Sequence, residues 1–417
     1  MKDQNKNTLK PKLRFPEFVG QSLQKLQLRD VTAESTVRNG ETLPVGSVMG
    51  VTKTEGIVPM QERLIASDIA RYKLVRKDWF AYNPMRLNIG SIARWKRDND
   101  ILVSPDYVVF KCLKDSDLGI DPAYLDHFRQ TAAWENFVTE GGNGGVRVRI
   151  YYEDIARLHL ALPSPAEQRK IAECLASLDE LLAVEGRKLE ALRAHKKGLM
   201  QQLFPREGES RPRLRFPEFR DAGEWEATPL GKIADIKLGK MLSAGKHTTG
   251  RLLPYLNNIA VRWNEVDTSK LPQMYFDDDE LERFGLKAGD VVVCEGGEPG
   301  RSAVWDGRMP DIKFQKAIHR VRFNVPFVPH LLVSYLEAIA GTERFEMLFT
   351  GGGIKHLTLE TFAELTIPLI PFAEQQRIAA CLSSLDALIT AASRRLDGLR
   401  AHKKGLLQQL FPSPEEV

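Results

Sequence analysis

The sequence predicts an α+β protein (mixed α/β) in which a domain of helices and strands followed by a long helix occurs twice, as a pseudo-two-fold internal repeat. Three observations predict this class. The chain has 417 residues, whereas a single hydrophobic core seldom grows past about 250–300 residues. Two separate segments each return about 200 residues later in the chain. The segments that repeat most faithfully also have the apolar periodicity of paired helices.

Composition and charge exclude several classes of protein. Hydrophobic residues make up 43% and charged residues 27% of the chain, an ordinary globular composition that excludes wholesale disorder. The net charge of +4 permits a nucleic-acid partner without arguing for one. The longest stretch without a charged residue, 323–336, contains two prolines and is shorter than the ~18–20 apolar residues of a membrane span. We therefore expect no membrane partner.

The amino-terminal residues and the cysteines predict a cytoplasmic protein. Residues 1–7 lack the apolar core of a secretion signal. The cysteines are scattered and form no CxxC motif, which fits a reduced cytosol better than a disulfide framework or a zinc site. They are Cys112, Cys174, Cys294 and Cys381.

The internal repeat divides each half of the chain into a leader, a body and a tail. Residues 13–18 (LRFPEF) return as residues 214–219, and residues 166–205 return as residues 373–412 with 26 identities in 40 positions. The bodies between them show almost no such likeness, so we interpret the repeat as a domain duplication with divergent bodies. A polar linker, 206–212, joins the halves. The predicted segments are a first body with its leader at 1–162, a tail at 163–205, a second body with leader and linker at 206–369, and a tail at 370–417.

Both tails are predicted to be long helices. Ten positions in the first tail and ten in the second are spaced alternately by four and three residues, and eight and nine of them are apolar. This is the 3.5-residue repeat of a helix that faces a partner helix. We favour pairing of the two tails with each other in an antiparallel coiled coil, and the alternative is a long core helix within each half. Lys196 and Lys403 occupy matching seam positions, where they either fix the register or extend to water.

Antiparallel tails have a geometric consequence. The second helix then returns Pro412 to the neighbourhood of the first leader. A helix of this length extends roughly 55–60 Å at ~1.5 Å per residue.

The bodies are predicted to combine strands with short helices. Residues 106–111 and 290–294 are rich in β-branched residues, and residues 317–323 alternate like a half-buried strand. Residues 122–131 and 329–340 each begin with proline and favour helices. Glycine clusters at 141–145 and 351–353 close the two bodies.

Motifs of catalysis fail on inspection, so we expect no catalytic, metal or cofactor site in this chain. Residues 239–247 resemble a phosphate-binding loop but have five residues between the glycines and His247 where a Mg²⁺-binding hydroxyl belongs. Two carboxylates in the glycine-rich stretch 295–301 would repel phosphate, which favours a tight loop. The acidic run 277–280 suits a helix start better than a divalent cation.

The arrangement resembles the DNA-specificity subunit of type I restriction–modification enzymes. The likeness covers essentially the whole chain. It is strongest in residues 163–205 and 370–412, with support from residues 83–92 (NPMRLNIGSI) and 293–301 (VCEGGEPGR). The resemblance implies two target-recognition domains that each read half of a bipartite DNA site, separated by an antiparallel helix pair. Because the bodies differ, we expect unlike half-sites and an asymmetric target.

The resemblance also implies partners and a location. These are double-stranded DNA, two methyltransferase subunits and restriction/translocase subunits, in the cytoplasm of a prokaryote at its nucleoid. S-adenosylmethionine, ATP and Mg²⁺ would belong to the partner subunits, and this chain would be non-catalytic. Two alternatives stay open: a protein-binding scaffold with twin interaction domains, and a stand-alone DNA-modifying enzyme.

Side-chain type indicates the candidate DNA contacts, because Arg and Lys bind phosphates and Arg, Lys, Asn and Gln bind base edges. An ordinary solvated surface residue is the alternative at every position. The candidates in the first body are Arg86, Asn88, Arg94, Lys96 and Arg147, and those in the second are Lys240, Asn257, Asn258, Arg262, Lys316, Arg320 and Lys355.

Overall fold

The computed structural model describes residues 10–113, 119–140, 149–241, 249–351 and 355–412. They form two compact units, one of Met1–Glu185 with Arg395–Val417 and one of Gly186–Arg394. The division falls inside the two long helices, α5 (Pro165–Leu203) and α11 (Phe372–Leu410), each of 39 residues. Each unit therefore contains one body and half of each helix, and the chain is mixed helix and sheet as predicted.

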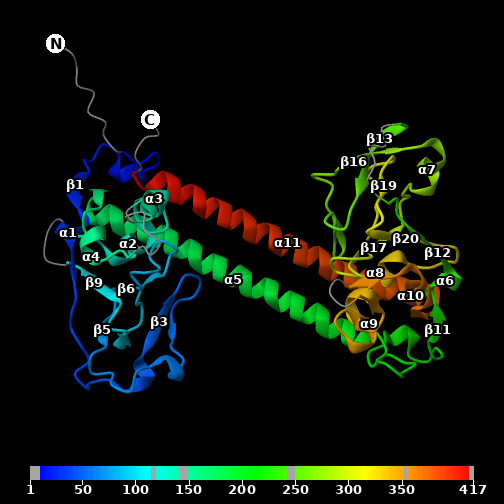
Figure 1. The fold of residues 1–417 in the computed structure, drawn as a ribbon, viewed down its shortest axis with the longest axis horizontal. Coiled ribbons are helices and arrows are strands. Elements are labelled where there is room, and N and C mark those ends of the chain that lie inside the picture. The colour runs from blue at the N-terminus through cyan, green and yellow to red at the C-terminus, as the bar shows by residue number, and fades with distance from the viewer. Residues whose placement is uncertain (1–9, 114–118, 141–148, 242–248, 352–354, 413–417) are drawn as a thin grey trace, which may run out of the picture. The chain divides into compact units, whose positions relative to one another are not determined.

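The body of the first unit is built on a four-stranded antiparallel sheet in the order β2-β9-β6-β7, and the remaining strands form the pairs β1·β10, β3·β4 and β5·β8 (Figure 1). Its strands are β1 (Gln24–Gln27), β2 (Thr32–Glu34), β3 (Met49–Thr52), β4 (Gly56–Pro59), β5 (Lys73–Val75), β6 (Phe80–Tyr82), β7 (Ile92–Arg94), β8 (Ile101–Val103), β9 (Val108–Cys112) and β10 (His159–Leu162). Its shorter helices are α1 (Leu28–Val31), α2 (Pro122–Phe128), α3 (Ala132–Glu140) and α4 (Tyr152–Ile155), with 3-10 turns η1 (Pro16–Phe18), η2 (Val45–Ser47) and η3 (Glu62–Leu64).

The body of the second unit contains a sheet of the same form in the order β12-β20-β17-β18, together with a three-stranded sheet β16-β13-β19. Its strands are β11 (Glu226–Pro229), β12 (Ala234–Leu238), β13 (Arg251–Leu256), β14 (Val261–Arg262), β15 (Glu265–Val266), β16 (Gln273–Phe276), β17 (Val291–Cys294), β18 (Ser302–Val304), β19 (Lys313–Phe314), β20 (Ile318–Phe323), β21 (Phe349–Thr350), β22 (His356–Leu357) and β23 (Thr366–Leu369). Its shorter helices are α6 (Leu230–Ile233), α7 (Asp278–Arg283), α8 (Pro329–Ile339), α9 (Glu343–Glu346) and α10 (Leu359–Glu364), with one 3-10 turn, η4 (Pro217–Phe219).

The two bodies share one topology although their sequences diverge. In each, a strand after the leader pairs with the strand that precedes the long helix, β1 with β10 and β11 with β23. The four-stranded sheets then match strand for strand, since β2, β9, β6 and β7 correspond to β12, β20, β17 and β18. The sheets are buried on both faces, because alternate side chains enter different cores. In β6, for example, Phe80 and Tyr82 face the core with the long helices, and Ala81 faces the other.

The two long helices run antiparallel within each unit. In the first unit Lys403 binds Asp179 and Arg395 binds Glu185, so residue numbers fall along α11 in the direction in which they rise along α5. In the second unit Lys196, late in α5, binds Asp386, early in α11, so the helices run in opposite directions there as well. The pairing that the apolar repeat predicts is thereby confirmed in each unit.

Each body is completed by the end of the helix that follows the other body. Phe411, just beyond α11, packs on Tyr124 and Phe128 of α2, with ring centroids 4.9 and 5.8 Å away. In the second unit Phe204, just beyond α5, packs on Tyr335 of α8 at 5.5 Å. The amide of Leu13 donates to the carbonyl of Gln409 at 2.9 Å, which confirms the predicted return of the chain end to the first leader.

The repeated leaders and tails meet through a largely buried ion pair in each unit. Arg14 binds the carboxylate of Glu167 through Nε, at 2.8 Å, and through Nη2. Arg215 binds Glu374 through the same two nitrogens at 2.7 and 2.8 Å. At the start of α5 the Ser164 hydroxyl accepts from the Glu167 amide at 3.4 Å, while the Glu167 carboxylate is committed to Arg14.

Most predicted elements of the bodies are present. Strands β9 and β17 and helices α2 and α8 lie within or next to the residues expected for them. The expectation of a half-buried strand at 317–323 was wrong, since both faces of β20 are buried along Ile318–Val321. A charged side chain tolerates this position because Asp235 on the neighbouring β12 binds Arg320. In the described part of the chain, no helix has the length and apolar character needed to cross a membrane.

Candidate nucleic-acid interface

The turn between β6 and β7 presents two of the predicted contacts to solvent. At the start of the turn the side-chain oxygen of Asn83 accepts a hydrogen bond from the Met85 amide at 2.9 Å. At its end the Arg86 carbonyl accepts a hydrogen bond from the Ser91 amide at 3.0 Å. Ser91 also donates its hydroxyl to the Val51 carbonyl at 2.8 Å, which fixes the turn to strand β3. Arg86 and Asn88 are exposed, and within the described residues neither side chain has a hydrogen-bond or ion-pair partner.

A further cation, Lys53, lies at the same place. Lys53 belongs to the turn between β3 and β4 and is exposed. The Cγ of Lys53 would be 3.4 Å from a Cβ placed at Gly90. Gly90 has a φ of +92°, a backbone angle that only glycine adopts readily. The turn cluster of the first unit is therefore Lys53, Met85, Arg86, Asn88 and Ile89. Sequence reasoning missed Lys53 because only the packing of β3 against β7 in the fold brings it there.

Arg94 and Lys96 surround the buried carboxylate of Asp126. Arg94 Nε lies 3.6 Å and Lys96 Nζ 3.1 Å from Asp126 Oδ2, and Arg129 donates to Oδ1 at 2.7 Å. Burial by itself would raise the pKa of Asp126, but these cations hold it below its usual value. Arg94 is a structural residue of this network, whereas Lys96 keeps 64% of its side chain exposed. Arg147 lies outside the described residues.

The turn between β17 and β18 of the second unit occupies the position equivalent to the β6–β7 turn. Gly297 and Gly300 have φ of +84° and +87°, so the stretch is the tight loop expected from its glycines. Arg301 donates to the Asn258 carbonyl at 2.7 Å, and Asn258 donates to the Gly296 carbonyl at 3.3 Å. Asn258 therefore braces this loop, while Asn257 accepts the Ala260 amide at 3.0 Å within its own turn.

Three predicted contacts of the second unit lie at its surface. Arg262, the last residue of β14, is exposed and binds Asp267 at 3.1 Å. Lys355, beside β22, is exposed and pairs with Glu346. Lys316 is half-buried and has no side-chain partner among the residues that the structure describes. Each of the three can reach an anion. For Arg262 and Lys355, binding a phosphate means giving up the ion pair with a surface carboxylate.

Lys240 and Arg320 lie inside the second unit instead. Lys240 donates to the Tyr275 carbonyl at 2.8 Å, pairs with Glu280 and lies over the ring of Phe276. Arg320 is 1% exposed, donates to Asp235 at 2.6 Å, and has its pKa lowered by burial. Side-chain type suggested both as DNA contacts, but the fold commits both to internal partners.

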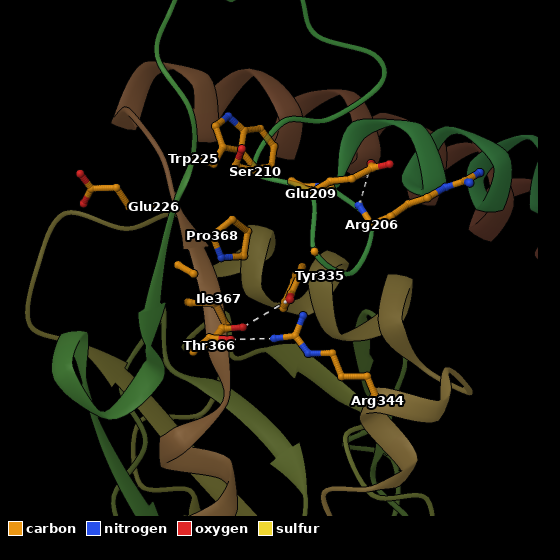
Figure 2. Close-up of a pocket in the computed structure, with 13 residues that line it drawn as sticks. Arg206, Glu209, Ser210, Trp225, Glu226, Tyr335, Arg344, Thr366, Ile367 and Pro368 are labelled. Atoms are coloured by element: carbon orange, nitrogen blue, oxygen red, sulfur yellow. Dashed lines mark hydrogen bonds between the residues drawn. The ribbon is translucent and has the colours of Figure 1, made fainter.

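The second unit also has a pocket of about 210 Å³ between the linker and strand β23 (Figure 2). Arg344 donates to the Thr366 hydroxyl at 2.6 Å, and the Tyr335 hydroxyl donates to the Thr366 carbonyl at 3.3 Å. The indole Nε1 of Trp225 is buried and, within the described residues, has no hydrogen-bond partner. Across the described ranges, no cluster of His, Cys, Asp and Glu is arranged to bind a metal ion.

Comparison with known proteins points to one family. Residues 222–400 match the family described as the type I restriction modification DNA specificity domain. A protein of Methanocaldococcus jannaschii named as the MjaX specificity subunit of a type I restriction enzyme is 26% identical over 364 residues, which cover 84% of this chain and 81% of that protein. The MjaVIII specificity subunit of the same organism is 25% identical over 307 residues, 70% of each chain.

Two solved structures have a similar fold. The crystal structure of the S subunit of a type I restriction–modification system from M. genitalium superposes with a TM-score of 0.60 at 15% identity, covering 97% of this chain and 99% of that one. A chain from a structural study of complex assembly and conformational transition in a type I system gives 0.56 at 17% identity, covering 94% and 98%.

Proposed function

We propose, from the premise that this chain belongs to the DNA-specificity subunits of type I restriction–modification systems, that it reads an asymmetric, bipartite DNA site and docks two methyltransferase subunits. Residues 1–162 and 206–369 are the two recognition bodies under this proposal. Helices α5 and α11, within the segments 163–205 and 370–417, carry them.

One observation supports this proposal more than any other. The two bodies have the same sheet order, yet their equivalent turns carry different side chains. The β6–β7 turn presents Arg86 and Asn88, whereas the β17–β18 turn presents a glycine-rich loop braced by Arg301. A duplicated scaffold with unlike recognition turns is what two unlike half-sites require, because base identity is read by specific side chains in the grooves.

The exposed side chains supply both kinds of DNA contact. Arg86 and Asn88 are of the types that bind guanine and adenine edges with two hydrogen bonds each. Lys53 and Lys96 suit phosphate oxygens, as do Arg262, Lys316 and Lys355 in the second body. With a net charge of +4, we expect modest affinity of the isolated chain, with much of the phosphate contact supplied by its partners.

Catalysis is assigned to the partner subunits. Two methyltransferase subunits would use S-adenosylmethionine, and restriction/translocase subunits would use ATP and Mg²⁺. This chain would supply recognition and docking, in the cytoplasm and at the nucleoid.

Mapping of methylated bases in cells that express this chain with its partner subunits tests the proposal. We expect methylation at one asymmetric sequence, composed of two short unlike half-sites separated by roughly one helical turn. Cells with the partner subunits but without this chain are the control, and they should lack this methylation. Methylation at a contiguous or perfectly palindromic site, or at unchanged sites in the control, would contradict it.

A further inference from the structure

A seam lysine in the second unit joins three helices. Lys196 of α5 is 4% exposed, and its ammonium lies 2.6 Å from Asp386 of α11 and 2.5 Å from Glu337 of α8. The sequence left two alternatives for this lysine, namely that it fixes the register or that it extends to water. Its burial shows that extension to water is wrong. A buried ammonium between two carboxylates holds its geometry because any displacement leaves a charge buried without a partner.

The contact continues from Glu337 to a turn at the surface. Asn264 donates its side-chain amide to Glu337 Oε2, the oxygen that binds Lys196, at 2.9 Å. Asn264 lies in the two-residue turn between β14 and β15 with φ of +62°, and its backbone amide donates to the Ser302 carbonyl at 3.0 Å. Arg262, an exposed candidate contact, is on the strand that enters this turn.

The first unit contains the counterpart of this arrangement. Lys403 of α11 lies 2.5 Å from Asp179 of α5 and donates to Gln130 at 2.9 Å. Gln130 donates in turn to the carbonyl of Asp126 at 3.0 Å, and the Asp126 carboxylate binds Lys96. In both units a seam lysine is thus connected, through two residues of the body, to a candidate DNA contact or to the turn beside one.

We propose that Lys196 and Lys403 are positioning residues for DNA recognition. Each holds its body on the helix pair, and Lys196 acts through Glu337 and Asn264 on the placement of the β14–β15 turn. Neither lysine touches DNA. The inference rests on the proposed function and deepens it, because it assigns to the helix seam a part in reading each half-site.

The second unit offers a graded set of substitutions. Glu337→Ala removes the acceptor for both Lys196 and Asn264. Glu337→Gln restores an oxygen that accepts from Lys196, as Gln130 does for Lys403 in the first unit. Asn264→Gly leaves the lysine site intact, suits the positive φ and removes only the last contact. Glu343→Ala replaces an exposed acid of the neighbouring helix α9 and is the matched control.

The test measures methylation by the full complex of this chain with its partner subunits, on DNA carrying every single-base change in each half-site. We expect Glu337→Ala and Asn264→Gly to reduce discrimination at the second half-site by about tenfold, while the first half-site is unchanged. Glu337→Gln should restore most of it, and Glu343→Ala should match the wild type. Lys403→Met should affect only the first half-site.

Several outcomes would overturn the inference. A purely structural role would lower methylation of all sites together without altering base preference at one half-site. Unchanged discrimination in Asn264→Gly, which conserves the fold, would exclude positioning through the turn even if Glu337→Ala did not fold. Failure of the proposed function would appear differently, since the wild-type complex would then show no bipartite site at all.

Discussion

The ring of Phe411 lies against the ring of Tyr124, with centroids 4.9 Å apart, although one residue is near the carboxyl end of the chain and the other is in the first body. The first body therefore has no complete core until α11 has been made. Residues of α5 and of the carboxyl end of α11 belong to one hydrophobic cluster with the sheet of this body. Folding of the first unit thus depends on residues from both ends of the chain.

Phe411→Ala should destabilise the first unit by about 3–5 kcal/mol, because it leaves a cavity between Tyr124 and Phe128. Urea unfolding, followed by the fluorescence of the tryptophans, measures the loss. Phe372→Ala, at the exposed first residue of α11, is the control and should change stability by less than about 0.5 kcal/mol. An unfolding curve of Phe411→Ala that coincides with the wild type would show that this contact does not support the core.

Glu374→Gln should destabilise the second unit by about 3 kcal/mol. The Glu374 carboxylate is buried and binds Arg215 through two hydrogen bonds, so the substitution leaves a partly buried guanidinium without its counter-charge. Arg377→Ala, which breaks an exposed ion pair with Glu218, should cost less than about 1 kcal/mol. Chemical denaturation of both variants makes the comparison, and equal losses would be inconsistent with a special role for the buried pair.

The free energy of unfolding should fall in acid because the His127 imidazole is buried. Burial lowers the pKa of this imidazole to about 4, below the ordinary value of ~6.5. The unfolded chain then binds the proton more readily than the folded one, so the contribution is fully present above pH ~6.5 and is lost as the pH falls toward 4, on the order of 3 kcal/mol in all. His127→Gln should flatten the stability profile over this range. His402→Gln, at an exposed position, is the control, and an unchanged slope in His127→Gln would refute the assignment.

Arg86→Ala and Asn88→Ala should each weaken methylation of the cognate first half-site by about 1–3 kcal/mol, equivalent to roughly 5- to 150-fold. Both side chains are exposed, so the fold should be unaffected. Competition between DNAs that differ at single positions gives the measurement. Lys53→Ala should instead lower affinity for all sequences alike and reduce the salt dependence, because a phosphate contact carries no base information. Loss of base discrimination in Lys53→Ala would reverse these assignments.

Local pattern and repetition allowed much of the fold to be predicted. The apolar spacing of the tails predicted α5 and α11, and antiparallel pairing predicted that the chain end meets the first leader. The pattern could not predict which side chains from the other helices and strands of each body would lie beside a given seam position. Lys196 occupies a seam position in either case, and only α8, packed against the helices, brings Glu337 to it.

The candidate site was less predictable for the same physical reason. Arg320 and Arg86 are the same residue type, but one lies in a buried central strand beside Asp235 and the other in an exposed turn. Burial of a charged side chain depends on a partner supplied by a strand distant in sequence. The alternation along residues 317–323 therefore could not reveal it.

Exchange of the first body for that of another specificity subunit, followed by mapping of methylated bases in the complete complex, tests the central claim most directly. The account predicts that the half-site read by the first body changes while the other half-site and the distance between them are retained. A change in both half-sites, or a recognised sequence that does not respond to the exchange, would contradict it.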